Sequence, residues 1–193
     1  RSLIYLDDQD SECHNRADEF ALGGDLLTCP VSKPKVEGRW MYLPNGNWFN
    51  FWTGEMVQGG EERWVDVPLN LTPLFIRGGS ILPLAPIRMS SAAPLTHMDL
   101  NVYADDGAAE GTLYEDAGDG FGDSILKSFF FEGNTLRQTR KGDFAPVYGL
   151  YRVRFAGLDH EPKSVSIDGG AKVKLKRGLR IELPENFTEA IFE

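Results

Sequence analysis

The sequence predicts an all-β fold made of two consecutive antiparallel β-sandwich-like domains. Short β-prone runs recur along the chain, and each is bounded by Gly, Pro or Asn. In the second half, apolar and polar residues alternate with the period of two that marks strands buried on one face. No long amphipathic helical pattern interrupts these runs. With 193 residues, 41% of them hydrophobic, the chain can bury two small cores.

The first 25 residues differ in composition from the rest. Apolar Leu3, Ile4 and Leu6 lead into an acidic, polar stretch from Asp7 to Asp18. This pattern favours a connector with at most one short helical piece. Because the sequence also opens on Arg1 without a signal-peptide pattern, we expect residues 1–25 to lead in from something larger.

The first β-domain is predicted over residues 26–92. Its β-prone runs are 26–31, 38–43, 48–52 and 64–67. Asn45-Gly46 tolerates the positive φ angles of a tight turn, so the strands on either side of it are expected to pair. Residues 73–83 predict two further strands kinked at Gly78-Gly79. The linker-like composition of residues 89–95 places the domain boundary there.

The second β-domain is predicted over residues 93–193. Apolar Met98, Leu100 and Val102 alternate with polar residues, and the same alternation recurs at 151–155. It continues at 164–167, 172–175 and 179–183, with Gly-containing turns between the runs. Regularly spaced short strands of this kind are typical of a sandwich.

Composition excludes several classes of function. The net charge of −9 would repel polyanions, so no nucleic-acid partner is expected. No apolar stretch approaches the roughly 20 residues of a membrane helix, so no membrane partner is expected either. Cys13 and Cys29 are too few for a disulfide framework or a four-cysteine zinc site, and we interpret them as reduced structural thiols. The two sequons in the sequence do not decide the compartment.

The acidic segment 105–123 is the sharpest local feature. Asp116, Asp119 and Asp123 could offer oxygens to a hard cation such as calcium, but the spacing fails the EF-hand pattern because Ala117 occupies the third position. The favoured interpretation is two turns, one at Asp106-Gly107 and one Gly-rich loop whose Asp side chains bond their own backbone. A bound cation remains the alternative.

The aromatic residues of the first domain form a second candidate, because sugar binding would exploit the cluster of Trp40, Trp48, Phe49, Phe51, Trp52 and Trp64. We single out five of them as either packing residues or a sugar platform: Trp40, Trp48, Phe51, Trp52 and Phe75. In run 48–52, Trp48 and Trp52 are expected to point to one side and Phe49 and Phe51 to the other. Packing in the core or against a neighbouring domain is favoured, because aromatic side chains dominate buried interfaces.

No catalytic residue or cofactor is predicted in the chain. Retaining glycoside hydrolysis needs two carboxylates about 5 Å apart that face a sugar from opposite sides, and acids adjacent in a turn do not meet that need. The three histidines are far apart in the sequence, without metal-ligand spacing or a nucleophile motif.

Three stretches together resemble the C-terminal region of family 31 α-glycosidases. The first is Asp18-Glu19-Phe20-Ala21-Leu22-Gly23-Gly24-Asp25-Leu26-Leu27-Thr28-Cys29-Pro30-Val31. The second runs from Tyr42-Leu43-Pro44 through Trp48-Phe49-Asn50-Phe51-Trp52-Thr53-Gly54 to Val67-Pro68. The third is Pro73-Leu74-Phe75-Ile76-Arg77-Gly78-Gly79-Ser80-Ile81-Leu82-Pro83. The last is the most specific. The similarity is strong over residues 18–120 and weaker beyond.

The resemblance implies a parent enzyme with a (β/α)8 barrel whose two catalytic aspartates lie upstream of Arg1. Residues 1–6 would then end the barrel's last segment, and the two β-domains would brace the barrel. The implied partners are that barrel, in the same parent chain, and an α-glucan or oligosaccharide substrate. An α-glucosidase is the foremost activity, and the fragment alone is expected to be inactive. The alternative is a carbohydrate- or cation-binding β-sandwich module.

Overall fold

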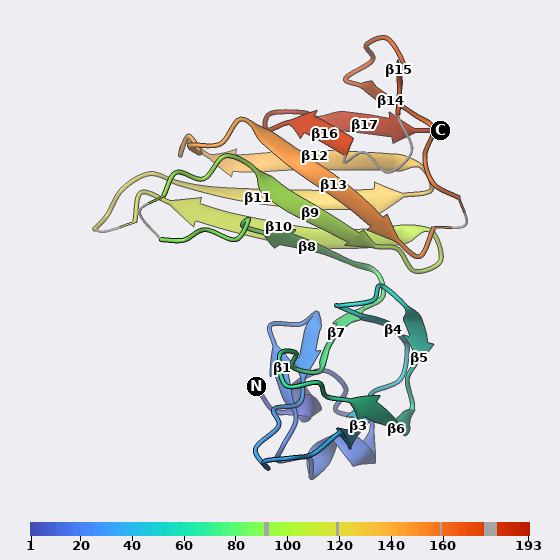
Figure 1. Cartoon of the computed structure of the whole chain (residues 1–193). Coiled ribbons are helices and arrows are strands. Elements are labelled where there is room, and N and C mark those ends of the chain that lie inside the picture. Colours follow the sequence, from blue (N-terminus) through green and yellow to red (C-terminus); the bar gives the residue numbers. More distant parts are fainter. Residues whose placement is uncertain (91–92, 119, 159, 176–180) are drawn as a thin grey trace. The chain divides into compact units, whose positions relative to one another are not determined.

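The computed structural model describes residues 1–90, 93–118, 120–158, 160–175 and 181–193. The chain divides into two compact units, Arg1–Gly78 and Gly79–Glu193, which are called unit 1 and unit 2 below. In the described residues the secondary structure is nearly all strand, with two short 3-10 helices (Figure 1). The all-β prediction is therefore confirmed. No helix in the described ranges is long and apolar enough to cross a membrane.

Unit 1 contains a five-stranded sheet and a two-stranded ribbon. The sheet has the order β1-β2-β7-β4-β5, and the ribbon pairs β3 with β6 in antiparallel register. Its elements are η1 (Leu3–Tyr5), η2 (Ser11–His14), β1 (Phe20–Leu22), β2 (Leu26–Thr28), β3 (Gly38–Leu43), β4 (Asn47–Asn50), β5 (Met56–Gln58), β6 (Glu61–Asp66) and β7 (Leu74–Arg77).

The core of unit 1 draws on nearly all of these elements. Leu3 and Cys13 from the two 3-10 helices pack with Leu27 and Cys29, so the lead-in segment is part of the unit. Cys13 and Cys29 are free thiols. Burial raises the pKa of each to about 12, which keeps both in the inert thiol form.

The hairpin predicted at Asn45-Gly46 is wrong. The strands on either side of this turn do not pair: β3 pairs with β6, while β4 pairs with β5 and β7. Gly46 has the expected positive φ of 116°, but its carbonyl accepts from the Gly59 amide and the Leu43 carbonyl accepts from the Gly60 amide. The turn thus sends the chain from the ribbon into the sheet instead of folding one strand onto the next.

Unit 2 contains a single sheet that is ten-stranded in the described residues, in the order β15-β14-β17-β12-β11-β10-β8-β9-β13-β16. Most pairs are antiparallel, while β8–β10 and β9–β13 are parallel. The strands are β8 (Ser80–Leu84), β9 (Met98–Tyr103), β10 (Ala108–Asp116), β11 (Ser124–Glu132), β12 (Thr135–Gly142), β13 (Leu150–Ala156), β14 (Ser164–Ile167), β15 (Val173–Lys174), β16 (Ile181–Pro184) and β17 (Glu189–Phe192).

This sheet folds back on itself to form two layers. Strands β11 and β13 are not neighbours in the sheet, yet Phe129 meets Tyr151 with ring centroids 5.5 Å apart, and Phe131 meets Phe155 at 5.1 Å. In Figure 1, β9 and β13 cross over the layer of β10, β11 and β12. The aromatic rings between the layers form the centre of the unit 2 core.

The division between the units lies earlier than the sequence predicted. It falls between Gly78 and Gly79, whereas residues 26–92 were assigned to one domain. The Gly78 amide donates to Asn47 in unit 1, and the Gly79 amide donates to Tyr103 in unit 2. Strand β8 then pairs with β9 over its whole length and touches β10. Local composition cannot report such long-range pairing, which is why the Ser- and Ala-rich segment near residue 92 was the stronger boundary signal.

Candidate functional site

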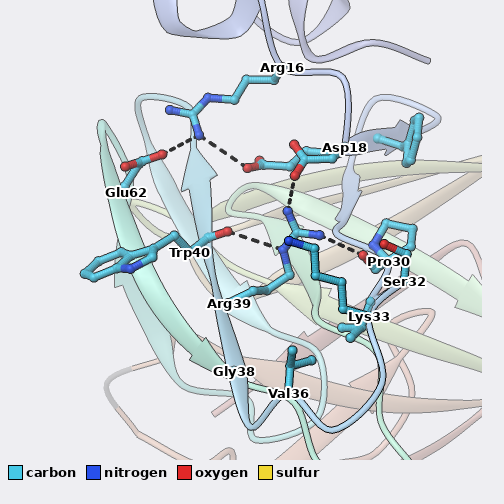
Figure 2. Close-up of a pocket in the computed structure, with 13 residues that line it drawn as sticks. Arg16, Asp18, Pro30, Ser32, Lys33, Val36, Gly38, Arg39, Trp40 and Glu62 are labelled. Atoms are coloured by element: carbon cyan, nitrogen blue, oxygen red, sulfur yellow. Dashed lines mark hydrogen bonds and ion pairs between the residues drawn. The ribbon is translucent and has the colours of Figure 1, made fainter.

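Two surface hollows of unit 1 each include a tryptophan of the β3–β6 ribbon. The first, here called the Trp40 hollow, has a volume of about 560 Å³ (Figure 2). It is lined by residues that follow η2, by β1, by the segment after β2, and by the start of β3. Charged side chains and exposed apolar side chains both line it.

Arg16 organises one side of the Trp40 hollow. Its guanidinium donates to Glu62 at 2.5 Å and to Glu12 at 3.0 Å, and it lies 3.6 Å from Glu19. It also lies 4.8 Å from the centre of the Tyr42 ring. Figure 2 shows Arg16 reaching across to Glu62 on β6. This network connects the lead-in segment to the ribbon.

Glu19 is the most unusual group in the Trp40 hollow because only 1% of it is exposed. Its Oε1 accepts the Tyr42 amide at 3.0 Å, whereas its Oε2 has no hydrogen-bond partner among the described residues. Burial raises the pKa of Glu19 to about 6, although the Tyr42 amide and Arg16 act in the opposite direction. The carboxyl group is therefore held in a site that disfavours its charge.

Arg39 and an apolar rim complete the Trp40 hollow. Arg39 donates to the Pro30 carbonyl at 2.7 Å and forms an ion pair with Asp18, both visible in Figure 2. Phe20, Val31 and Trp40 are 40%, 39% and 58% exposed. Three large apolar side chains thus border a charged surface without being covered by unit 1.

The second hollow, here called the Trp52–Trp64 hollow, has a volume of about 410 Å³. Its floor is formed by apolar side chains that include Val57, Val65 and Phe75. Trp52 and Trp64 line it and are 48% and 52% exposed. Polar side chains also line it, namely Asn50, Thr53, Glu55, Arg63, Asp66 and Thr72.

Hydrogen bonds fix both indoles of this hollow. Trp52 donates its ring N–H to the Thr72 carbonyl at 2.7 Å, and Trp64 donates its ring N–H to Asp66 at 3.1 Å. Trp64 also lies above Gly38, where an added Cβ would come within 2.4 Å of the indole. Glycine at position 38 therefore allows the ring to lie close to the β3 backbone.

The five aromatic candidates fall into different environments. Trp48 and Phe75, at 0% and 2% exposure, belong to the unit's own core, so Trp48 is unavailable to any partner and Phe75 contributes only to a hollow floor. Phe51 is half-buried, and its ring meets Trp52 edge-on at 4.9 Å. Trp40 and Trp52 are exposed.

Trp64 belongs with Trp40 and Trp52, although it was not among the five candidates. It lies directly opposite Trp40 in the β3–β6 register, and the two rings meet at 5.9 Å. Cross-strand register was the signal that would have placed it opposite Trp40. The incorrect hairpin prediction hid that register.

The acidic loop shows the local turn chemistry expected of it. Asp116 accepts the Gly118 amide at 2.9 Å, and the Ala117 amide donates to the Asp123 carbonyl at 3.1 Å. Asp119 lies outside the described residues. Among the residues that are described, no group of three or more His, Cys, Asp or Glu side chains is placed to hold a metal ion.

Unit 2 contains a buried charge cluster that sequence reasoning missed. Lys127 is fully buried, and its amine lies 2.8 Å from Glu115, 2.7 Å from Glu185 and 2.9 Å from the Tyr148 hydroxyl. Burial alone would lower the pKa of Lys127, but hydrogen bonds to the two carboxylates outweigh it and raise that pKa. The available signal was a lysine at an inward position of β11, between Ile125 and Phe129.

Comparison with protein families gives a match over the first part of the chain. The family described as "Glycosyl hydrolase family 31 C-terminal domain" matches residues 1–82. Alpha-glucosidase 2 of Bacillus thermoamyloliquefaciens is 34% identical over 122 residues, which are 63% of this chain and 16% of that protein. Glucoamylase 1 of Schwanniomyces occidentalis is 30% identical over 183 residues, which are 87% of this chain and 18% of that protein.

Solved structures show the same fold. A family 31 dextranase from Flavobacterium johnsoniae superposes with a TM-score of 0.83 at 20% identity, covering 100% of this chain and 29% of that one. A family 31 alpha-xylosidase from Xanthomonas citri gives a TM-score of 0.75 at 25% identity, covering 98% of this chain and 21% of that one. The chain thus spans less than a third of each similar protein cited here.

Proposed function

We propose that this chain, which belongs to glycosyl hydrolase family 31 and matches its C-terminal domain, supplies the non-catalytic β-domains of a retaining α-glycosidase. In this proposal the parent enzyme hydrolyses terminal α-linked sugars, and α-glucosidase is its foremost activity. The names of the similar enzymes, which include α-glucosidases and an α-xylosidase, support an α-glycosidic substrate. The two catalytic aspartates and the (β/α)8 barrel are proposed to lie upstream of Arg1.

The proposed role of the β-domains is to brace the barrel. The observation that supports this role is the Trp40 hollow. Phe20, Val31 and Trp40 are exposed large apolar side chains around one hollow, an arrangement that marks an interaction surface. Charged and large apolar side chains both line the hollow, so it offers a partner apolar contact area together with ion-pairing groups.

The bracing role is tested in the full-length parent enzyme. The paired substitution Trp40→Ala and Phe20→Ser should accelerate thermal inactivation and lower Tm, because it removes apolar contact area with the barrel. The KM for p-nitrophenyl α-glucoside should stay unchanged, since the active site lies elsewhere. Met56→Ser is the matched control, because Met56 is 53% exposed and lines neither hollow described above.

Two results would contradict the proposal. If the paired substitution altered thermal inactivation no more than Met56→Ser does, the Trp40 hollow would not hold the barrel. If the parent released the β-anomer from an α-glycoside, as followed by NMR, the retaining mechanism would be refuted.

A further inference from the structure

We propose that the Trp52–Trp64 hollow is a binding site for a neutral oligosaccharide. This inference goes beyond the proposed function, because a bracing domain needs no ligand. It rests on the ring positions, on the polar groups around them and on the dimensions of the hollow. The volume of about 410 Å³ lies within the range of small-ligand sites, which is roughly 300–1,000 Å³.

The two indoles are held in place before any ligand arrives. Each ring N–H is already bonded inside unit 1, Trp52 to the Thr72 carbonyl and Trp64 to Asp66. The exposed half of each side chain therefore offers ring surface and not the polar N–H edge. Rings fixed in this way lose little conformational freedom on binding, which favours affinity. The apolar face of a pyranose is a suitable partner for such surfaces.

The loop that carries Trp52 is also fixed. The Asn50 side-chain oxygen accepts the Trp52 amide at 2.9 Å and the Thr53 amide at 3.1 Å, so one amide side chain holds the turn after β4. Trp64 is held from the other side by its edge-to-face contact with Trp40 and by its close approach to Gly38. Both rings thus sit on local structure that is already ordered.

The polar side chains around the rings fit a ligand with many hydroxyl groups. Glu55 and Asp66 are exposed carboxylates at the hollow. Asp66 accepts the Trp64 ring N–H with Oδ1, so its Oδ2 can accept a hydrogen bond from a ligand hydroxyl. Thr53 can both donate and accept a hydrogen bond. Alternating apolar faces and hydroxyl edges are the surface that a neutral sugar presents, whereas a strongly anionic ligand would meet two carboxylates here.

The lining of this hollow combines two exposed indoles with hydrogen-bonding side chains. Glu55, Arg63 and Asp66 are its charged members. The Trp40 hollow is also lined by charged side chains, but it differs in its border of three large exposed apolar side chains, Phe20, Val31 and Trp40. We therefore assign the Trp40 hollow to the barrel and the Trp52–Trp64 hollow to a sugar.

The site is tested by titrating the 193-residue chain with maltose and with isomaltotriose, followed by tryptophan fluorescence and calorimetry. Saturable binding is expected, and Trp52→Ala and Trp64→Ala should each weaken it by at least about tenfold. Tyr114→Ala is the control, since Tyr114 is a 61% exposed aromatic residue of unit 2. Glycerol at equal concentration controls for hydroxyl groups without a ring face and should give no saturable response.

Milder variants distinguish a loss of ligand binding from a loss of folding. Trp52→Phe keeps an aromatic ring and should retain more affinity than Trp52→Ala, and Glu55→Gln should weaken binding while leaving both rings in place. Circular dichroism and Tm establish that each variant is folded. The proposed function is scored on thermal inactivation of the parent enzyme with Trp40→Ala and Phe20→Ser, and this site is scored on sugar binding by the 193-residue chain, so failure of this site and failure of the proposed function give different results.

Three outcomes would overturn the inference. The first is no saturable response to either sugar at the highest soluble concentration. The second is saturable binding that persists unchanged in both alanine variants. The third is protection of Trp52 and Trp64 from iodide quenching in the parent enzyme, because protection would mean that the rest of the polypeptide covers the hollow.

Discussion

At the scale of single residues, Glu19 in the Trp40 hollow makes the stability of the fold depend on pH. Its pKa is raised from the ordinary value of 4.5 to about 6 because burial disfavours the charged carboxylate. The protonated form is therefore favoured in the folded state, and its contribution to stability is fully present below pH 4.5 and is lost as pH rises through 6. Arg16, Asp18 and Arg39 are the charged groups that also act on it.

We predict that Glu19→Gln removes this pH dependence. Above pH 7 the variant should gain about 2 kcal/mol of unfolding free energy over the native chain, and below pH 4.5 the two should converge. Urea denaturation between pH 4 and 8 measures the difference. Glu62→Gln, which alters an exposed carboxylate that pairs with Arg16, should change the unfolding free energy by nearly the same amount at every pH. A constant difference between Glu19→Gln and the native chain at all pH values would contradict the argument.

Lys127 gives the corresponding prediction for unit 2. Lys127→Met leaves Glu115 without its cation and Glu185 with Arg140 alone, so it should destabilise unit 2 by about 3–5 kcal/mol. Adding Glu115→Gln and Glu185→Gln should recover part of the loss. Both are measured by urea denaturation.

The matched control for Lys127 is Lys172→Met. Lys172 pairs with Glu193 at the surface, where both side chains are about half exposed, and its loss should cost no more than about 1 kcal/mol. Equal effects of the two lysine substitutions would show that burial of the Lys127 cluster has no energetic consequence.

Residue environments were only partly predictable from the sequence. Alternation placed Trp48 and Trp52 on the same face, yet Trp48 is buried and Trp52 is exposed. The alternation ends because β4 stops at Asn50, whose side chain accepts two amides of the following turn. A residue after Asn50 no longer follows the strand period. Strand length, which depends on the partners β5 and β7, was not readable locally.

At the scale of elements, strand positions were easier to predict than strand partners. The strands at 38–43, 74–77 and 98–103 lie where the sequence indicated them. Their partners differ from simple neighbour pairing, since β3 pairs with β6 and β8 lies between β9 and β10. The Asp106-Gly107 turn was predictable because both residues need positive φ, at 48° and 73°. The pairing of strands that are distant in the sequence produces no comparable local sequence pattern.

Strand β8 gives the prediction at this scale. A fragment that begins at Gly79 should fold, because it keeps the strand that joins β9 to β10. A fragment that begins at residue 93, the boundary that composition suggested, should not fold, because it exposes the hydrogen-bonding edges of both strands and loses the buried Ile81. Dispersion in two-dimensional NMR spectra and cooperative thermal unfolding distinguish the two. Cooperative folding of both fragments would refute the placement of β8.

At the scale of the whole molecule, the sequence motifs identified the family where local periodicity could not identify the topology. The run Pro73 to Pro83, the most specific motif, spans the end of unit 1 and the start of unit 2. A motif that identifies the family can therefore span two compact units. The two hollows were not predictable at all, because each combines side chains from segments that are distant in sequence.

The last prediction concerns catalysis by the chain itself. Retaining hydrolysis needs two carboxylates about 5 Å apart that face a sugar, one of them able to donate a proton. Glu19 has the raised pKa of a proton donor, but it is buried and its Oε1 is bonded to the Tyr42 amide. Glu115 and Glu185 both pair with the Lys127 amine, and Glu185 also pairs with Arg140. We therefore expect the 193-residue chain alone to release no p-nitrophenol from p-nitrophenyl α-glucoside, even if it binds maltose, while the parent enzyme turns the substrate over. Activity that co-purifies with the chain and disappears in Glu19→Gln would show instead that the catalytic acid lies in unit 1.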